Sequence, residues 1–367
     1  MHLNPELLLL LLGAIVLLIA VAELSIGRSE LRGADYFIFT RVFLCGCVLP
    51  VILIAYASFH SCANTIVWQF AKAAAVSSGI LLSTAVLGWW LDPTSPLGSK
   101  DGRPIIFGAD TIQSGSFIVL FATSASVVLF PTHRQRWWLL IALALAAYAI
   151  YAVGTTQALL SFVTLLVILC YRSKRPLILT IIVGGVVCML ILMTPALELL
   201  STEIPESQAS TAFSRLEKLP DEFSDEENQR WGQFIESINV ARDNPFTGGG
   251  FNSWRGGQVF TSQGSEPAVY TSYPHGIIPS LLNDRGLLIG LLITLLLSIV
   301  FLRAFKCAGL MPLRSPQWGA AVFMVCLPLS GALFSGIYWT SGFLITSLTL
   351  MVIATTSTRH LLIPLAK

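Results

Sequence analysis

Arg230 and His275 are the two residues of this chain whose types and surroundings point most directly to chemistry. Both lie in its one long hydrophilic segment, residues 196–276. The guanidinium of an arginine presents a planar fork of donors that suits phosphate. A histidine, whose unperturbed pKa is about 6.5, can take a hydroxyl proton at neutral pH. The alternatives are an arginine that only reaches toward solvent and a histidine that only lies at a membrane surface.

The composition of the chain indicates what kind of protein must position these residues. Of its 367 residues, 54% are hydrophobic and 11% are charged, whereas about 25% of the residues in soluble domains are charged. A soluble globular protein is therefore excluded. A disordered protein is excluded too, because disordered chains are poor in large apolar residues. The net charge of +2 is too small to indicate nucleic acid as a partner. We expect an all-α integral membrane protein.

Apolar runs of about 20 residues, the length that crosses a bilayer, predict ten spans in a single integral membrane domain. Seven lie in residues 1–195 and three in residues 277–367. The fifth and sixth meet at Gly154–Thr155 and form either two spans or one long broken helix. The first run has no basic stretch before it and no small-x-small site after it, which predicts a span and not a cleavable signal. The ten runs are residues 7–25, 36–57, 65–91, 112–130, 137–153, 156–171, 177–195, 280–302, 317–334 and 337–356.

Lysine and arginine in the short connections predict the orientation, because cytoplasmic loops carry an excess of them. With ten spans, the connections after spans 4, 6 and 8 share one side with the C-terminus, and together they hold ten basic residues and no acidic one. The opposite short connections, at 154–155 and 335–336, carry no charge. Both termini are therefore expected in the cytoplasm and the segment 196–276 outside. That outer segment has 12 acidic and 5 basic residues from Glu198 to His275.

An amphipathic helix is predicted inside the outer segment, over residues 225–243. Ser224 and Glu227 form a capping box at its start, and the chain leaves the helix at Asn244–Pro245, because the residue before a proline is disfavoured in the helical region. Arg230 lies at the edge of the apolar stripe, beside Trp231. The helix is expected to lie against the membrane domain or along the interface. The residues of the stripe are Trp231, Phe234, Ile235, Ile238 and Ala241.

Other kinds of site find little support in the sequence. The seven cysteines all lie in or beside apolar spans and none lies in the outer segment, so we expect packing residues and no disulfide framework. No metal-binding motif, phosphate-binding loop or nucleophile elbow is present. We expect no metal and no cofactor. Three ionisable residues within the spans, Glu23, Arg41 and Lys72, lie near span ends, where reaching the interface reduces their cost.

Two stretches resemble the O-antigen ligase and polymerase superfamily (WaaL/Wzy-like). The first runs from Arg230–Trp231 to Asn244–Pro245–Phe–Thr–Gly248–Gly–Gly250–Phe251 and resembles the signature R-W … N-P-l-x-G-x-G-x-f. The second, His275 to Gly290, resembles H-N-x-x-L-x-x-L-x-x-x-G-x-x-G. The many spans and the single large loop late in the chain agree with the resemblance, which implies a design similar to GT-C glycosyltransferases.

The resemblance also implies a function. Members of the superfamily move a glycan from undecaprenyl diphosphate to an acceptor at the periplasmic face of the bacterial inner membrane. The acceptor is a lipid A-core sugar in ligases and another lipid-linked repeat in polymerases. Carried onto this chain, Arg230 binds the diphosphate, with Trp231 beside it, and His275 deprotonates the acceptor hydroxyl. The partners expected are therefore a lipid-linked glycan donor, a glycolipid or glycan acceptor and membrane lipid.

The chain departs from the superfamily pattern in ways that bear on the site. A second arginine, expected in a Ser-Arg-Gly-like turn, is replaced at Gln157, which can hydrogen-bond phosphate but carries no charge. Gly276 follows the histidine where Asn or Ser is common, and ten spans stand where twelve are usual. Either another arginine supplies the missing charge or the donor or activity is altered. The candidate arginines are Arg215, Arg242, Arg255 and Arg285.

The expected mechanism is a metal-independent glycosyl transfer with inversion. Negative charge that builds on the leaving phosphate needs cations, and with no metal cluster outside, arginines must supply them by preorganised electrostatics. One base on the acceptor side indicates a single displacement, unlike the two-carboxylate scheme of retaining enzymes. The rival from another class is a non-catalytic transporter of lipid-linked glycans. Transporters are marked by inverted repeats and broken helices around a midplane site, and neither is clear in this sequence.

Overall fold

A computed structural model describes much of the middle and C-terminal part of the chain. Predicted spans 7–25 and 177–195, nearly all of 36–57, and the capping box at Ser224 lie outside the described residues. So do three candidate site residues, Arg215, Arg255 and His275. The described residues are 52–54, 63–91, 99–100, 103–106, 111–132, 136–173, 229–246, 248–249, 276–330 and 337–356.

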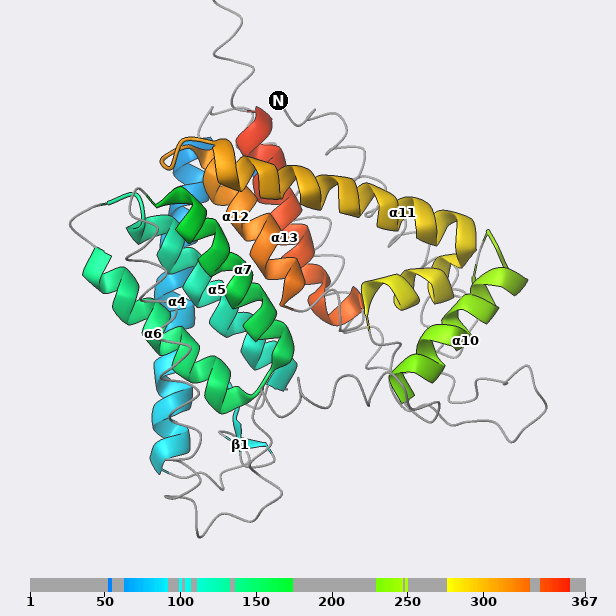
Figure 1. Ribbon diagram of the computed structural model, residues 1–367, viewed down its shortest axis with the longest axis horizontal. Coiled ribbons are helices and arrows are strands. Elements are labelled where there is room, and N and C mark those ends of the chain that lie inside the picture. The colour runs from blue at the N-terminus through cyan, green and yellow to red at the C-terminus, as the bar shows by residue number, and fades with distance from the viewer. Residues whose placement is uncertain are drawn as a thin grey trace, which may run out of the picture. The chain divides into compact units, whose positions relative to one another are not determined.

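The described residues are almost entirely helical (Figure 1), which confirms the all-α prediction. A two-stranded antiparallel hairpin, β1 (Ser99–Lys100) with β2 (Arg103–Pro104), is the exception among them. Within the described ranges, two stretches are long and apolar enough to cross a membrane, Asn64–Leu87 and Arg285–Leu310, and five shorter apolar helices are also present there. The helices are α4 (Ala63–Leu91), α5 (Thr111–Leu129), α6 (Arg136–Val153), α7 (Thr156–Arg172), α10 (Gln229–Asp243), α11 (Ile277–Leu310), α12 (Pro316–Leu329) and α13 (Ile337–Thr356).

The predicted fifth and sixth spans are two separate helices, α6 and α7. Gly154 has a φ of 68°, and its amide donates to the carbonyl of Ile150 at 2.9 Å, the geometry of a glycine cap at a helix end. Thr155 is extended and immediately precedes α7, which begins at Thr156. A left-handed residue followed by an extended one ends a helical path, so the alternative of one long broken helix is excluded.

The chain forms two compact units, and each is described by itself. The α5 unit comprises residues 64–219 and 304–331, and the α10 unit comprises the remaining residues. In the α5 unit, α5, α7 and α12 pack on one another. Aromatic contacts join α12 to its neighbours: Phe323 meets Phe70 edge-on with ring centroids 5.3 Å apart, and Trp318 stacks near Phe130 at 6.2 Å.

Small residues let the helices of the α5 unit approach closely. A Cβ on Gly115 would stand 2.4 Å from Oγ1 of Thr155 and 3.1 Å from Cβ of Ala158. Several buried residues of α5 are serines, whose side chains are small. The hydroxyl of Ser116 donates to the carbonyl of Ser330. Helices in lipid pack through small residues and occasional polar contacts in this way.

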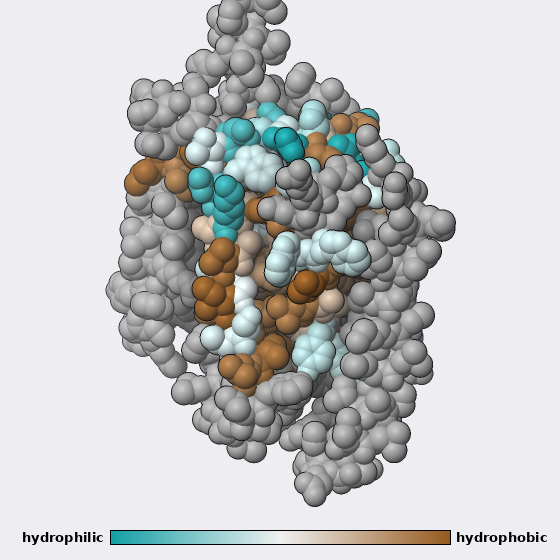
Figure 2. Space-filling model, turned by 90° about the vertical axis from the view of Figure 1, so that its left-hand side faces the viewer, coloured by the Kyte–Doolittle hydropathy of each residue, from teal (hydrophilic) through white to brown (hydrophobic). Residues whose placement is uncertain are grey.

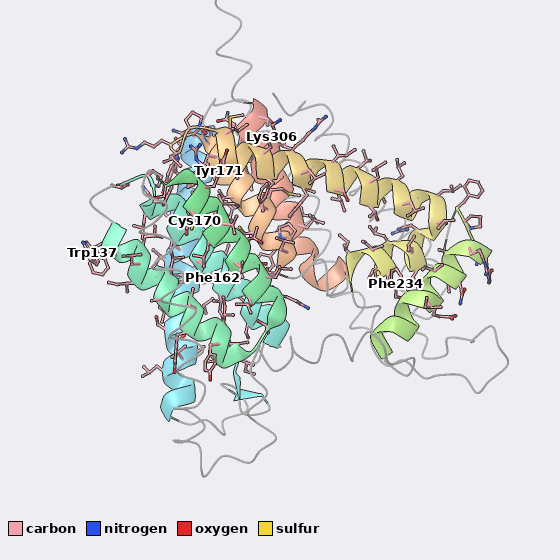
Figure 3. The ribbon with its side chains drawn as sticks, in the orientation of Figure 1. Trp137, Phe162, Cys170, Tyr171, Phe234 and Lys306 are labelled. Carbon is pink, nitrogen blue, oxygen red and sulfur yellow. The ribbon has the colours of Figure 1, made fainter. Side chains whose placement is uncertain are left out.

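The outward faces of the α5 unit are apolar. In the coloured part of Figure 2, hydrophobic residues lie among nearly neutral ones over the middle and lower region, and hydrophilic ones gather at the upper end. Trp137, at the start of α6, points away from the helices (Figure 3). Large exposed apolar surfaces on a folded chain indicate contact with lipid or protein. Exposed apolar residues of α4, α6 and α7 include Val76, Ile80, Leu87, Ile141, Leu160, Val163 and Val167.

Helix α11 differs from the predicted span 280–302, because it is longer and broken. Gly286 inside it has φ 74° and ψ 177°, a region of backbone space that only glycine occupies readily. Figure 1 shows the two arms of α11 meeting at a sharp bend near the end of α10. Three polar residues, Asn283–Asp284–Arg285, directly precede the bend. The long apolar runs on either side of them predicted a single span.

Candidate functional site

Helix α10 carries Arg230 in its first turn and ends at Asp243, where the sequence predicted its end. Its buried side differs from the predicted apolar stripe. Ser237 and Ala241 are fully buried, whereas Ile235 is 41% exposed. Phe234, labelled in Figure 3, is half-buried. Small side chains therefore define the face of α10 that packs against protein, whereas Ile235 stays a predicted member of an apolar face along the interface.

Glu236 is a buried carboxyl on α10 that the sequence pattern does not single out. It is 9% exposed. Burial raises the pKa of Glu236, a hydrogen bond from the side chain of Asn239 opposes that rise, and the nearby charge of Asp243 adds to it. Desolvation dominates because a buried carboxylate loses the water that stabilises its charge. No feature of the helical pattern distinguished this glutamate from the solvated ones.

The chain turns tightly after α10. The amide of Gly248 donates to the carbonyl of Asn244 at 2.8 Å, and Gly248 has a φ of 58°. A Cβ at this position would stand 2.3 Å from the carbonyl oxygen of Asn283 and 2.6 Å from the amide nitrogen of Gly286. The glycines after Asn244–Pro245 therefore allow the backbone of this turn to lie directly against the backbone of α11.

The turn after α10 lies directly against the break in α11. The amide of Gly249 donates to the carbonyl of Asn283 at 2.7 Å, and the amide of Leu288 donates to the carbonyl of Pro245 at 3.0 Å. We call these contacts between residues 244–249 and 283–288 the backbone clasp. The two stretches that carried the family resemblance thus meet in space, although 33 residues lie between Gly249 and Asn283 along the chain.

Two candidate substrate-binding arginines lie on the elements joined by the clasp. Arg242 is in the last turn of α10, is exposed, and its Nε lies 3.4 Å from a carboxylate oxygen of Asp243. Arg285 is half-buried and immediately precedes the break at Gly286. The structure therefore places both arginines in one region of the α10 unit. The side chains of Arg230 and Trp231 lie outside the described residues, as does all of His275.

The histidine segment enters α11 through a second strained glycine. Gly276, directly after His275, is buried and has a φ of 113°, a conformation that side chains rarely adopt. Helix α11 begins at the next residue, Ile277. Gly276, which stands where Asn or Ser is common in the superfamily, therefore makes the sharp entry into this helix.

Gln157 belongs to the α5 unit, in the first turn of α7. Its Oε1 is buried and accepts no hydrogen bond from the described part of the chain. The hydroxyl oxygens of Thr155, just before α7, and of Ser161, within it, are likewise buried and unpaired within that part. An unpaired buried polar atom costs about 1–3 kcal/mol, so this end of α7 carries unused hydrogen-bonding capacity at the position where the superfamily pattern has an arginine.

Metal-ligating side chains do not gather in the described part of the chain. No group of three or more histidine, cysteine, aspartate or glutamate residues lies close together there. Cys170, Cys307 and Cys326 are free thiols, and the two last are buried.

A protein-family comparison assigns part of the chain. Residues 141–295 match the family Wzy_C, described as O-antigen ligase. The matched range contains most of α6, all of α7 and α10, and the clasp, together with Gln157, Arg230 and His275. No curated protein matches the chain at a significant level. The family match confirms the resemblance predicted from the two motifs, because residues 141–295 match a family model of the O-antigen ligase and polymerase superfamily.

Proposed function

We propose that this protein is a glycosyltransferase of the O-antigen ligase type, which moves a glycan from undecaprenyl diphosphate to a lipid A-core sugar or a similar acceptor. The observation that carries the proposal is the family match over residues 141–295. That range includes both motifs, and the backbone clasp holds parts of the two motifs together. Polymerases of the same superfamily use the same donor chemistry with a lipid-linked repeat as acceptor.

The proposed reaction places cations on the donor and a base on the acceptor. Arg230 binds the diphosphate through its two-pronged guanidinium. Arg242 and Arg285 lie near the clasp and supply further positive charge, which compensates for the neutral Gln157. Arg215 and Arg255 remain candidates for the same role. His275 accepts the proton of the acceptor hydroxyl as that oxygen attacks the sugar carbon, the bond to the leaving phosphate breaks, and the configuration inverts. Arginines replace a metal in stabilising the leaving group.

The proposed setting is the bacterial inner membrane. Ten spans, cytoplasmic termini and a periplasmic segment over residues 196–276 follow from the apolar runs and from the lysine and arginine bias. The apolar helices and their exposed hydrophobic faces support a lipid environment. In this topology the donor diphosphate lies at the outer surface, within reach of α10.

Deletion of the protein followed by gel analysis of surface glycans tests the function. A ligase predicts that long glycan chains disappear from lipid A-core while lipid-linked chains accumulate. A polymerase predicts that a single repeat unit remains attached to lipid A-core. Unchanged surface glycans, with a lipid-linked donor that is still consumed, would contradict both readings. A donor that accumulates on the cytoplasmic side would instead indicate a transporter.

A further inference from the structure

The backbone clasp supplies hydrogen-bond partners to backbone groups that the break in α11 leaves without partners inside the helix. At a helix end the last carbonyls have no partners within the helix, and at a helix start the first amides have none. Gly286 creates both kinds of end inside α11. Gly249 donates to the carbonyl of Asn283 on the first arm, and Pro245 accepts from the amide of Leu288 on the second arm. The turn after α10 is therefore bonded to both arms of α11.

Two glycines make this contact possible, and both are constrained in conformation and in space. Gly248 and Gly286 have positive φ values of 58° and 74°. A Cβ on Gly286 would stand 2.3 Å from the carbonyl oxygen of Asn244 and 2.6 Å from that of Pro245. The obstructing atoms in both cases are backbone, so no side-chain rotation relieves the clash. Any larger residue must push α10 and α11 apart.

Helix α10 extends away from the clasp, so a small rotation at the clasp displaces the far end of this helix. Arg230 lies 13 residues before Asp243, so at a rise of about 1.5 Å per residue it is about 20 Å from the clasp. A rotation of about 3° at the clasp displaces the start of α10 by about 1 Å, and a displacement of that size lowers the rate of an oriented reaction by about 10²-fold. Small changes at the clasp are therefore expected to alter chemistry at a distance.

We propose that Gly248 and Gly286 are positioning residues for the transfer reaction. They touch neither donor nor acceptor. They hold α10, with Arg230 in its first turn, against the break of α11, whose first arm begins two residues after His275. The proposal rests on the proposed function, since it concerns how that site is assembled.

Kinetics of glycine variants provide the first test. Gly248→Ala and Gly286→Ala are compared with wild type in the purified full chain, with a lipid diphosphate-linked glycan as donor. The matched control is Gly309→Ala, in the same helix, where a Cβ meets the ring of Tyr171 at 3.2 Å and that exposed side chain can move aside. Each clasp variant is expected to lose about 10²-fold in kcat/KM, with a raised donor KM, and the control to stay within twofold.

The division between KM and kcat separates positioning from folding. A merely structural role reduces the fraction of folded enzyme, which lowers kcat and leaves the donor KM unchanged. That pattern in both clasp variants, or wild-type kinetics in either one, overturns the proposal. A wild-type chain that transfers no glycan removes the proposed function, and the positioning role with it. Transfer by wild type and by both variants alike removes only the positioning role.

A reversible disulfide across the clasp tests the positioning role within a single preparation of folded protein. The backbone hydrogen bond of 2.7 Å between Gly249 and Asn283 makes this pair the choice for an engineered disulfide across the clasp. Gly249→Cys with Asn283→Cys is made in a chain whose 7 native cysteines are replaced, and the oxidised and reduced forms of one preparation are compared. If the clasp is a fixed support, the oxidised form transfers glycan at least as fast as the reduced form. Loss of transfer on oxidation that reduction restores shows that the turn must leave the break, and overturns the proposal.

Discussion

The guanidinium of Arg172, at the end of α7, donates a hydrogen bond of 2.7 Å from Nη1 to the carbonyl oxygen of Gly309, near the end of α11. Its Nη2 donates to the carbonyl of Met311, also at 2.7 Å. Carbonyls at a helix end lack partners within the helix, and a cation there also meets the negative end of the helix dipole. One side chain thereby ties two helix ends of the α5 unit together.

Removal of this link is expected to lower the thermal stability of the protein. Arg172→Gln loses charge-assisted bonds, and with a half-buried side chain we expect a loss of about 2 kcal/mol. Arg172→Lys keeps the positive charge but loses the two-pronged geometry of the guanidinium. Its stability should therefore lie between that of wild type and that of Arg172→Gln. The measurement is the apparent Tm in detergent. Arg314→Gln is the control, because Arg314 is exposed. An Arg172→Gln variant as stable as this control would show that the link contributes nothing.

Glu236 is expected to make stability depend on pH. Its folded-state pKa is raised above the ordinary value of 4.5, chiefly by burial. The stability that this carboxyl contributes is therefore fully present below pH 4.5 and is lost as pH rises through the raised pKa. Glu236→Gln, which stays neutral, should raise the Tm at neutral pH and flatten its decline from acid to neutral pH.

The matched control for Glu236 is Asp243→Asn on the same helix. Asp243 is exposed and adds only a minor repulsion to Glu236, so this variant should keep the decline in Tm from acid to neutral pH. The result that contradicts the assignment is an unaltered pH dependence in Glu236→Gln.

Substitution of Arg230 is expected to affect donor binding, and substitution of His275 is expected to affect turnover. Arg230→Lys should weaken donor binding, because a point charge cannot replace a two-pronged donor, and a contact of this kind is worth about 1.5–3 kcal/mol. His275→Ala should leave donor binding nearly intact and lower turnover by roughly 10²–10⁴-fold. Donor affinity and transfer rate are measured for each variant in membranes with the protein level checked.

Two results would refute these roles. Full transfer by His275→Ala would remove the proposed base. Wild-type donor affinity in Arg230→Lys would remove the proposed diphosphate contact. A His275→Ala variant that fails to accumulate would support a packing role for the histidine in place of a catalytic one.

Topology is tested by labelling with a cysteine-reactive reagent that does not cross membranes. Cysteines placed at Ser210 or Ser262 should react in cells whose outer membrane is permeabilised, and one placed at Ser173 should not. The reason is the concentration of lysine and arginine in the connections that include Ser173. Each variant is also labelled after the inner membrane is opened, which controls for accessibility. Labelling of the Ser173→Cys variant in cells with an intact inner membrane would reverse the orientation.

Transfer is expected to survive EDTA. The proposed site uses arginines to stabilise the leaving phosphate, and preorganised charges can fill that role. The measurement is glycan transfer by the purified protein with and without chelator. If EDTA abolishes transfer and magnesium restores it, acidic residues of the outer segment must be reassigned as ligands.

Local signals in the sequence were sufficient for several elements. The apolar run 337–356 predicted the helix Ile337–Thr356, and Asn244–Pro245 predicted the end of α10 at Asp243. Both follow from short-range causes, namely hydrophobic length and the steric effect of a proline on the residue before it. The motif around Arg230 and His275 likewise identified the superfamily, which the family match confirms.

Only the tertiary structure decided how these elements fit together. The break at Gly286 follows the polar residues Asn283–Asp284–Arg285 within the predicted span, but its two helix ends are satisfied by Gly249 and Pro245, which lie more than 30 residues earlier. The burial of Glu236 and the exposure of Ile235 depend on what packs against α10, and the bonds of Arg172 depend on α11. Periodicity reports the interactions of a segment with itself and with its solvent. Close contacts between distant backbone segments require glycines. A glycine in the sequence does not indicate which segment it contacts.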